Sequence, residues 1–310
     1  MPELRKDPIV GRWVIVETEN PKPPEAFEIK PHHYDESANC PFCYGNEHMT
    51  PPEIQAFRYD KTAPNTPGWQ VRVVPNKFPA LQIEGELDRR GMGIFDLSNG
   101  IGAHEVIVET PYHTKDLSEL ELTEIEKVLN MYALRSRDLA KDKRFKYIMI
   151  FKNYGAPGGA TMDHNHSQLI ALPMIPKNVL EELHGAEGYF KYRERCIFCD
   201  VIRQEIEEKD RIIAENRHFI SFCPFVSRFP FEMWILPKEH TLSYCDITKE
   251  QIPELAKILK EVLCRMKTVL KDPPYNFIIH TSPIDGEERL GYHWHMEIMP
   301  RISRIAGFEW

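Results

Sequence analysis

Short alternating stretches and one long helical repeat mark the first half of the chain. Apolar, mostly β-branched residues alternate with polar ones over residues 70–74 and 104–109, which predicts two strands. Between residues 117 and 139 apolar residues recur near helical spacing with charges between them, which predicts one long amphipathic helix. An apolar run at residues 147–151 predicts a buried strand, and a glycine-rich segment separates it from another predicted strand at 164–172.

The second half repeats this order of elements. We expect strands at residues 218–222 and 231–236, a helix at 249–270, and strands at 276–280 and 293–299. Two stretches that read alike predict two similar domains, and 310 residues is an ordinary length for two domains. We therefore expect an α+β fold with an N-terminal domain at 1–175, a C-terminal domain at 190–310 and a connection over residues 173–195.

Composition and charge exclude several classes of protein. No apolar run approaches the ~18 residues that a membrane-spanning helix needs, so we expect no membrane partner. Charged residues at positions 3–7 stand where a secretory signal would need an apolar stretch, which predicts a cytoplasmic location. A formal charge of −8 lacks the basic surface that nucleic acids require, so we expect no nucleic-acid partner.

Cysteines and histidines recur in the same order in both halves. Each half has a Cys-x-x-Cys pair, a histidine just before the long helix and a His-x-His segment. The interval from the single histidine to that segment is 51 residues in the first half and 53 in the second. In a reducing compartment these residues favour tetrahedral zinc over disulfides. The predicted ligands are Cys40, Cys43, His113 and His164 at one site, and Cys196, Cys199, His240 and His293 at the other.

The second metal has an alternative set of ligands. An oxygen and nitrogen site could form in place of the second cysteine and histidine set, and iron is an alternative to zinc there. Its ligands would be Glu182, His280, His293 and His295. At either site the simplest alternative is a pair of free thiols beside unrelated histidines.

One histidine of the first His-x-His segment is a candidate nucleophile. Alternation along a strand places His164, His166 and Gln168 on one face, so that one histidine can hold a metal while the next faces a substrate. A glycine-rich loop upstream can cradle phosphate oxygens with its N–H groups, and the uncharged Gln168 amide can steady them. We therefore predict that the imidazole of His166 attacks a phosphate. The alternatives for His166 are a third metal ligand or a hydrogen-bonded core histidine.

Several motifs in order resemble one family. His164-Asn165-His166-Ser167-Gln168, the upstream Cys-Pro-Phe-Cys, the segment 75–79 and the opening residues 4–13 are similar to the galactose-1-phosphate uridylyltransferase family of the histidine triad superfamily. The resemblance implies two tandem histidine-triad-like domains, each an antiparallel sheet with a long helix. It also implies a homodimer, and a catalytic first domain beside a structural second one that contributes sugar contacts.

The resemblance also implies a reaction. His166 would attack the α-phosphate of a nucleotide sugar and release a hexose 1-phosphate, and a second hexose 1-phosphate would then take the nucleotidyl group. UDP-glucose and galactose 1-phosphate are the expected substrates, and the product belongs to galactose metabolism. Ser167 is shared with relatives that resemble ADP-glucose phosphorylases, so an adenylyl donor is an alternative. Two further alternatives for the function are a histidine triad hydrolase and a zinc-stabilised binding module.

The same resemblance assigns residues to the substrate. The catalytic residues would be His166 and Gln168. Asn76, Lys77 and Phe78 would lie at the base and ribose, and Phe308 and Glu309 would approach the sugar. The remaining substrate contacts would be Asn153, Gly158, Gly159, Ala160, Thr161 and Ser167. Glu297 stands where the first motif has Gln168, and a carboxylate would repel phosphate, so we expect His295 not to be a second nucleophile.

Overall fold

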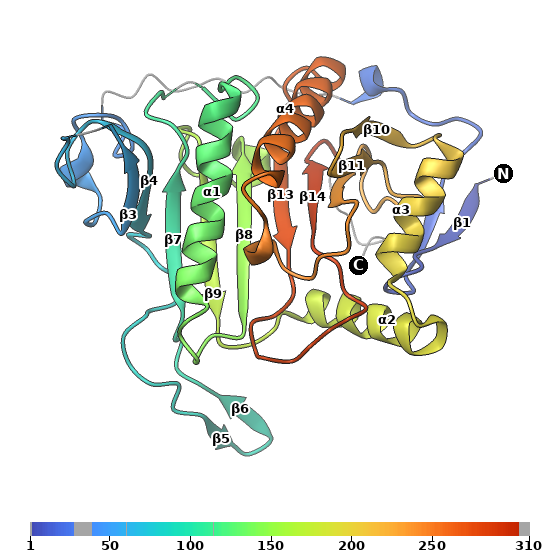
Figure 1. The fold of residues 1–310 in the computed structure, drawn as a ribbon, viewed down its shortest axis with the longest axis horizontal. Helices are drawn as coiled ribbons and strands as arrows, with labels where there is room; N and C mark the ends of the chain where they lie inside the picture. The colour runs from blue at the N-terminus through green and yellow to red at the C-terminus, as the bar shows by residue number, and fades with distance from the viewer. Residues whose placement is uncertain (1, 28–38, 60, 114, 304–310) are drawn as a thin grey trace.

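A single ten-stranded antiparallel sheet forms the body of the molecule (Figure 1). The structure is a computed structural model, and it describes residues 2–27, 39–59, 61–113 and 115–303. Along the sheet the strands follow the order β10-β11-β12-β14-β13-β8-β9-β7-β4-β3. The order is the same when read inward from either edge, because each half supplies five strands in equivalent sequence. This confirms the α+β fold with one antiparallel five-stranded unit and one long helix in each half.

The main elements of the two halves correspond in pairs. Those of the first half are β3 (Gln55–Arg58), β4 (Trp69–Pro75), β7 (Ala103–Val108), α1 (Leu122–Leu139), β8 (Tyr147–Tyr154) and β9 (His166–Leu172). Those of the second half are β10 (Ile212–Glu215), β11 (Phe219–Phe222), β12 (Met233–Pro237), α4 (Gln251–Leu270), β13 (Tyr275–His280) and β14 (His295–Pro300). The strands and helices predicted from the sequence are all present, with ends shifted by a few residues.

The two half-sheets join edge to edge through β8 and β13. These strands pair antiparallel, with Tyr275 opposite Tyr154 and Asn276 opposite Asn153. The expectation of a separate sheet in each half is therefore corrected, because hydrogen bonds continue across this seam. The seam also brings a strand of the second half beside the glycine-rich segment of the first.

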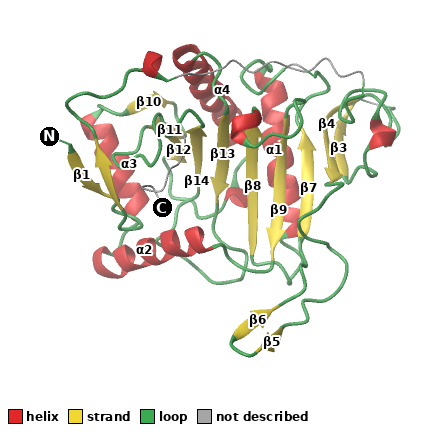
Figure 2. Ribbon diagram, turned by 180° about the vertical axis from the view of Figure 1, so that it is seen from behind, coloured by secondary structure: helices red, strands yellow, loops and turns green. Residues whose placement is uncertain are grey.

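The two faces of the sheet are covered differently. Helices α1 and α4 lie side by side on one face and bury the largest apolar cluster of the protein against the sheet (Figures 1 and 2). On the other face of the second half, a separate apolar cluster packs beneath α2 (Lys177–Arg193) and α3 (Ile197–Glu208). A third cluster, formed by the segment around Cys40 and Phe42, lies on strands β4 and β7. Burial of these apolar side chains provides most of the driving force for folding.

The long helix of the first half begins later than the apolar pattern suggests. Asp116 accepts hydrogen bonds from both the backbone N–H and the hydroxyl of Ser118, a turn that precedes the helix. Glu121 and Glu124 then form a reciprocal capping box, which satisfies N–H groups at the start of the helix. Local capping therefore sets the first residue of α1 at Leu122, and Leu117 and Leu120 are buried ahead of it.

Helix α2 occupies most of the segment that the sequence analysis treated as a connection. It begins directly after Pro176, and α3 follows after a short turn. The remaining elements of the described residues are two hairpins and four short 3₁₀ turns: β1 (Glu3–Lys6) with β2 (Trp13–Val16), β5 (Arg90–Met92) with β6 (Phe95–Leu97), η1 (Pro24–Ala26), η2 (Glu47–Met49), η3 (Ala156–Gly158) and η4 (Tyr244–Asp246). Among all the helices of the described ranges, none has both the length and the apolar character needed to cross a bilayer.

Candidate active site and metal centres

The four predicted ligands of the first half come together in one cluster. Cys43 Sγ lies 3.4 Å from His113 Nδ1 and 3.5 Å from His164 Nδ1, and Cys40 Sγ lies 3.6 Å from His164 Nδ1. All four ligand atoms lie within 4.8 Å of one another. With zinc–sulfur and zinc–nitrogen bonds of about 2.3 and 2.0–2.1 Å, sulfur and nitrogen in a tetrahedral site are about 3.5 Å apart. The cluster therefore has dimensions that fit a tetrahedral metal ion.

The second nitrogen of His164 is fixed from behind. Its Nε2 lies 2.7 Å from the carbonyl oxygen of Thr110, which can only accept, so Nε2 carries the proton and Nδ1 keeps its lone pair. Burial, together with Cys40, raises the pKa of the Cys43 thiol to about 12. A bound metal ion would favour the thiolate instead, so loading this cluster releases protons.

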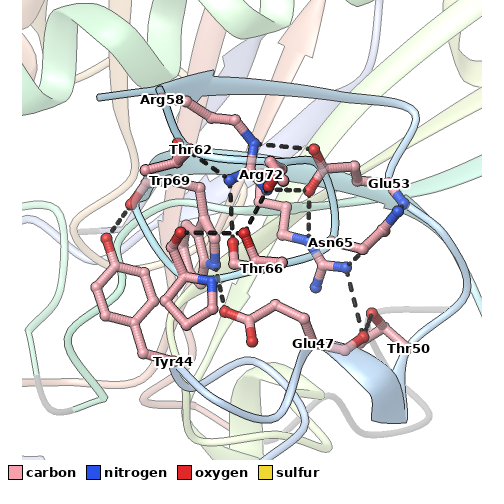
Figure 3. A network of polar contacts seen from close by, with 12 residues as sticks. Tyr44, Glu47, Thr50, Glu53, Arg58, Thr62, Asn65, Thr66, Trp69 and Arg72 are labelled. Carbon is pink, nitrogen blue, oxygen red and sulfur yellow. Dashed lines mark hydrogen bonds and ion pairs between the residues drawn. The ribbon is translucent and has the colours of Figure 1, made fainter. Parts of the chain in front are cut away.

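A network of polar contacts holds the segment that follows Cys43 against the sheet, as Figure 3 shows. The indole N–H of Trp69 donates to Glu47 Oε1 at 2.9 Å, and both residues are buried. Glu53 pairs at 2.6 and 3.1 Å with the guanidinium groups of two arginines on β3 and β4, Arg58 and Arg72. Because these contacts tie residues 47–53 to the edge of the sheet, the cysteine-bearing loop before them has a fixed position.

The predicted ligands of the second half also meet. Cys199 Sγ lies 3.5 Å from His240 Nδ1 and 3.6 Å from His293 Nδ1, and Cys196 completes a set within 4.8 Å. His293 Nε2 lies 3.0 Å from the carbonyl oxygen of Pro237, so this imidazole is fixed as His164 is. The hydrogen bond with Cys196, supported by those from the two histidines, lowers the pKa of the Cys199 thiol to about 3. Both groups of four could hold a metal ion.

The alternative oxygen and nitrogen site is not assembled as predicted. His293 points its Nδ1 at Cys199, whereas Glu182, His280 and His295 gather with Glu297. In that group His280 bridges two carboxylates, with Nδ1 3.1 Å from Glu182 and Nε2 3.3 Å from Glu297. Burial would lower the pKa of His280, but these two carboxylates outweigh it and raise the pKa to about 10. The ligand atoms of these four residues lie within 4.8 Å of one another, so this group could also hold a metal ion in place of the proton.

The structure presents His166 as a neutral, oriented imidazole. Its Nδ1 lies 2.8 Å from the carbonyl oxygen of His164, so Nδ1 donates and Nε2 carries the lone pair. The ring is buried, and this burial lowers the pKa of His166. Lys152, which donates to the carbonyl oxygen of His166 at 3.3 Å, acts in the same direction. A neutral imidazole of this kind is a competent nucleophile.

Ser167 faces the opposite side of β9. Its hydroxyl donates to Glu109 and contacts Tyr132, and all three side chains are buried under α1. Glu109 also pairs with Lys152 at 2.5 Å, and the side chains of this ion pair are fully enclosed. This placement excludes a side-chain contact between Ser167 and a substrate, which corrects the prediction for this residue. The buried pair was not predicted from the sequence, although Lys152 in a largely apolar strand was a visible signal.

Gln168 lies on the same face as His166 and meets a residue that the sequence analysis missed. His104 Nε2 lies 2.8 Å from Gln168 Oε1, and Asn76 Nδ2 lies 3.0 Å from the same nitrogen. Asn76 also accepts the N–H of Phe78 at 2.9 Å, while the ring of Phe78 is 84% exposed. The chain thus brings Asn76 and Gln168 to the same nitrogen of His104 and leaves the ring of Phe78 exposed beside Lys77.

The glycine-rich loop begins where β8 ends. Gly155 and Gly159 adopt φ angles of +71° and +86°, which favour glycine. A Cβ on Gly158 would lie 2.9 Å from the carbonyl oxygen of Tyr275, so the loop packs tightly on β13. The N–H groups of Gly158, Gly159 and Ala160 bond within this turn, and Thr161 follows it. The structure thus assembles a compact loop at the seam between the halves.

Asn153 connects this loop to the nucleophile. The register that places Phe151 opposite Gln168 carries Asn153 toward His166 on the neighbouring strand. Asn276 of β13, which the sequence analysis also missed, donates to Asn153 Oδ1 at 2.8 Å and to the carbonyl oxygen of Gly158 at 2.6 Å. The predicted sugar contacts Phe308 and Glu309 lie outside the described residues.

Comparison with known proteins gives matches along the whole chain. Residues 1–176 match the family model for the N-terminal domain of galactose-1-phosphate uridyl transferase, and residues 182–307 match the model for its C-terminal domain. An ADP-glucose phosphorylase from Arabidopsis thaliana is 38% identical over 99% of this chain and 87% of its own length. A galactose-1-phosphate uridylyltransferase from Thermotoga maritima is 30% identical over 97% of this chain and 87% of its own length.

Solved structures agree with these matches. The crystal structure of an ADP-glucose phosphorylase from Arabidopsis thaliana with bound ADP-glucose superposes with a TM-score of 0.83 at 37% identity, covering 100% of this chain and 92% of that one. A uridylyltransferase structure gives a TM-score of 0.76 at 29% identity, covering 100% of this chain and 91% of that one. The sequence matches and the shared fold agree with the resemblance drawn from the motifs. The chain belongs to the galactose-1-phosphate uridyl transferase family.

Proposed function

We propose that this protein is a nucleotidyltransferase that carries a nucleoside monophosphate from a nucleotide sugar to an acceptor phosphate on the Nε2 atom of His166. The observation that carries the proposal is the orientation of this imidazole. Its Nδ1–H donates to the His164 carbonyl, so the lone pair of Nε2 is available on the face that also bears Gln168. Membership of the family, with relatives named for this chemistry, supports the same reaction class.

The first half-reaction makes and breaks one bond each. His166 Nε2 attacks the α-phosphorus, the bond from that phosphorus to the bridging oxygen breaks, and hexose 1-phosphate leaves with the bonding electron pair. The imidazole gains positive charge as the phosphorus–nitrogen bond forms, and the carbonyl oxygen of His164 stabilises it through the Nδ1 hydrogen bond at 2.8 Å. In the second half-reaction an acceptor phosphate oxygen attacks the same phosphorus, and the neutral imidazole is restored.

We propose zinc at both cysteine and histidine clusters, with a structural role. The spacing of their ligand atoms suits tetrahedral zinc, and one histidine in each cluster is oriented by a carbonyl oxygen. At the first cluster a bound zinc would fix His164, whose carbonyl orients His166. Residues 1–175 would then carry the chemistry and residues 190–310 the second zinc site. The cytoplasmic location and the homodimer remain predictions.

We propose ADP-glucose as the first candidate donor, because the relative at 38% identity is an ADP-glucose phosphorylase. Orthophosphate would then be the acceptor and ADP the product. The second candidate is UDP-glucose with a hexose 1-phosphate acceptor, which the motifs of the sequence suggest and which the uridylyltransferase at 30% identity supports. Both reactions use the same nucleophile, so they differ in the base contacts and in the acceptor.

Intact-mass measurement tests the nucleophile and the donor together. The protein is exposed separately to ADP-glucose and UDP-glucose without an acceptor, and we expect the mass of one AMP or one UMP to be added. His166→Asn should abolish the gain. His295→Asn is the matched control, because His295 holds the equivalent place in the second half, and it should retain the gain.

The outcomes separate the candidate reactions. A gain with one donor only identifies the base. Continuous release of free nucleotide without an acceptor would indicate a hydrolase instead. A folded, metal-loaded protein that gains no mass from either donor would overturn the proposal of a covalent histidine.

A further inference from the structure

Two side-chain amides flank the nucleophile, and the direction in which each one points matters. Gln168 and Asn153 lie on the two sides of His166, one on its own strand and one on the neighbouring strand. An amide presents an acceptor oxygen at one end and an NH₂ donor group at the other, and only the NH₂ group favours a phosphate. The catalytic value of both residues therefore depends on what holds their oxygens.

His104 fixes the direction of Gln168. The backbone N–H of Ala80 lies 3.1 Å from His104 Nδ1 and can only donate, so Nδ1 accepts and Nε2 carries the proton. The described residues place two side-chain atoms near that Nε2. The oxygen of the Asn76 amide accepts the N–H of Phe78, so the NH₂ group of Asn76 is the end that faces Nε2. An NH₂ group cannot accept the Nε2 proton. The Nε2–H must donate to Gln168 Oε1 at 2.8 Å.

Asn276 fixes the direction of Asn153 by the same logic. The carbonyl oxygen of Gly158 can only accept, and it lies 2.6 Å from one end of the Asn276 amide, which must therefore be the NH₂ group. The same NH₂ group lies 2.8 Å from the Asn153 amide, so the Asn153 oxygen must be the acceptor. Asn276 lies on β13, in the half of the chain that does not carry the nucleophile.

Both amides are therefore held by their oxygens. Within the described part of the chain, neither the Gln168 nor the Asn153 NH₂ group donates a hydrogen bond to the protein. Two fixed donors of this kind need no reorientation when negative charge arrives, which is the property that makes an anion site effective. His104 from β7 and Asn276 from β13 each hold one amide oxygen, and these two strands lie on opposite sides of the strand that bears the nucleophile.

We propose that His104 and Asn276 are positioning residues that turn the Gln168 and Asn153 amides so that both NH₂ groups face the phosphates of a bound nucleotide. The inference rests on the proposed function, since it takes a nucleotide to be bound beside His166. It goes beyond that function by assigning roles to two residues that hold the phosphate-binding groups from behind.

The test compares the binding of ADP and UDP with that of adenosine and uridine by calorimetry. All variants are made in a His166→Asn background, so that no covalent step contributes. His104→Leu and Asn276→Leu should each weaken binding of the preferred nucleoside diphosphate about tenfold. Binding of the nucleoside, which has no phosphate, should change less than about twofold. His104→Gln, which can still donate to Gln168 Oε1, should restore most of the loss.

A second comparison excludes a merely structural role. If His104 acts through Gln168, adding His104→Leu to Gln168→Ala should cause no further loss, and the same holds for Asn276→Leu with Asn153→Ala. Matched controls are His218→Leu and Asn130→Leu. His218 precedes β11, and Asn130 lies on α1 and donates to the Glu126 carbonyl. Both controls should bind like the parent.

Several outcomes would overturn the inference. These are an equal loss of nucleoside and nucleoside diphosphate binding, full additivity in the double variants, and a parent that binds the diphosphates no better than the nucleosides. The inference can fail while the mass of the nucleotide is still added to the wild-type protein, in which case the proposed function stands. If no covalent adduct forms but the variants bind nucleotides as expected, the proposal of His166 as the nucleophile is overturned and the positioning roles stand.

Discussion

The two halves build the same histidine geometry and surround it with different chemistry. In the first half, Nδ1 of His166 lies 2.8 Å from the carbonyl oxygen of His164, and in the second, Nδ1 of His295 lies 3.1 Å from that of His293. The first histidine of each pair joins a cysteine cluster, and its Nε2 meets a carbonyl oxygen, of Thr110 or Pro237. The backbone of the duplicated unit is therefore sufficient to orient an imidazole.

The residues around that imidazole differ at equivalent positions of the sheet. Gln168 lies opposite Phe151, and Glu297 lies opposite Ile278. Two residues farther along the partner strands stand Asn153 in the first half and His280 in the second. On the strand at the other side, Val106 lies opposite Gln168 and Trp234 lies opposite Glu297. Two residues before these partners, the first half has His104 and the second half has Glu232. An arrangement of neutral amides is thus replaced by charged side chains.

The charged arrangement of the second half is closed upon itself. Glu297 pairs with Arg228 and with His280, and Arg228 pairs in turn with Glu232 at 2.8 Å. Rings of Phe198, Trp234 and His280 pack on His295 with centroids 4.8–5.2 Å away. The cavity beside His295 has a volume of about 30 Å³, room for one or two water molecules and far too small for a nucleotide. The neutral amides of Gln168 and Asn153 beside His166 offer donors for a phosphate, and the charged side chains beside His295 are instead paired with one another.

Removing one ligand from each cluster should produce the largest difference between the halves. Cys43→Ser and Cys199→Ser should each lower the metal content from two ions to one and reduce the free energy of unfolding by several kcal/mol. Because the first cluster holds His164, Cys43→Ser should slow adduct formation at least tenfold, whereas Cys199→Ser should leave the rate within about threefold. Metal analysis, thermal unfolding and single-turnover mass measurements check this. Equal loss of adduct formation in both variants would contradict the division of roles.

Exchanging Gln168 and Glu297 should have opposite effects on activity and stability. Gln168→Glu puts a carboxylate in the place of the proposed phosphate donor, and adduct formation should slow about 100-fold. Glu297→Gln leaves Arg228 and His280 short of a buried partner, so the free energy of unfolding should fall by about 3 kcal/mol while adduct formation stays within about twofold. Single-turnover kinetics and urea titration measure the two effects. A Gln168→Glu variant with normal kinetics would show that the amide does not contact phosphate.

The smallest of these effects should be the pH dependence of stability that His280 of the second half contributes. The folded-state pKa of His280 is raised to about 10, above its ordinary value near 6.5. Its contribution to stability is therefore complete below about pH 6.5 and is lost as the pH rises toward 10. Between pH 6.5 and 8 the stability advantage of the wild type over His280→Asn should shrink by roughly 2 kcal/mol. An advantage that stays constant with pH would mean that His280 is neutral in the folded protein.

The sequence predicted the parts of the fold that local patterns encode. Apolar alternation and helical spacing located the strands and the two long helices, and repeated spacing brought Cys40 and Cys43 together with His113 and His164. Helix α2 was missed because its polar and apolar residues separate weakly around the axis. The start of α1 was misplaced because capping by Glu121 and Glu124, and not the apolar pattern, ends the preceding turn.

Features that depend on pairing between distant strands could not be predicted in the same way. No local pattern places β13 beside β8, so the contacts of Asn276 with Asn153 and Gly158 were invisible. Strand alternation did indicate that Ser167 turns away from His166, and its burial beside Glu109 follows that signal. His104 had a weaker signal, as a polar side chain beside Glu105 in a strand whose other residues are apolar.

The seam between β8 and β13 makes the half that carries His166 depend on a strand of the other half. Asn276 and the Tyr275 carbonyl shape the glycine-rich loop of the other half, so the proposed reaction would constrain β13 even though the cavity beside His295 is too small for a nucleotide. A substitution on this strand can therefore reduce turnover without touching the substrate. The two duplicated units therefore depend on each other at the seam, because a substitution in β13 alters the packing of the glycine-rich loop in the first half.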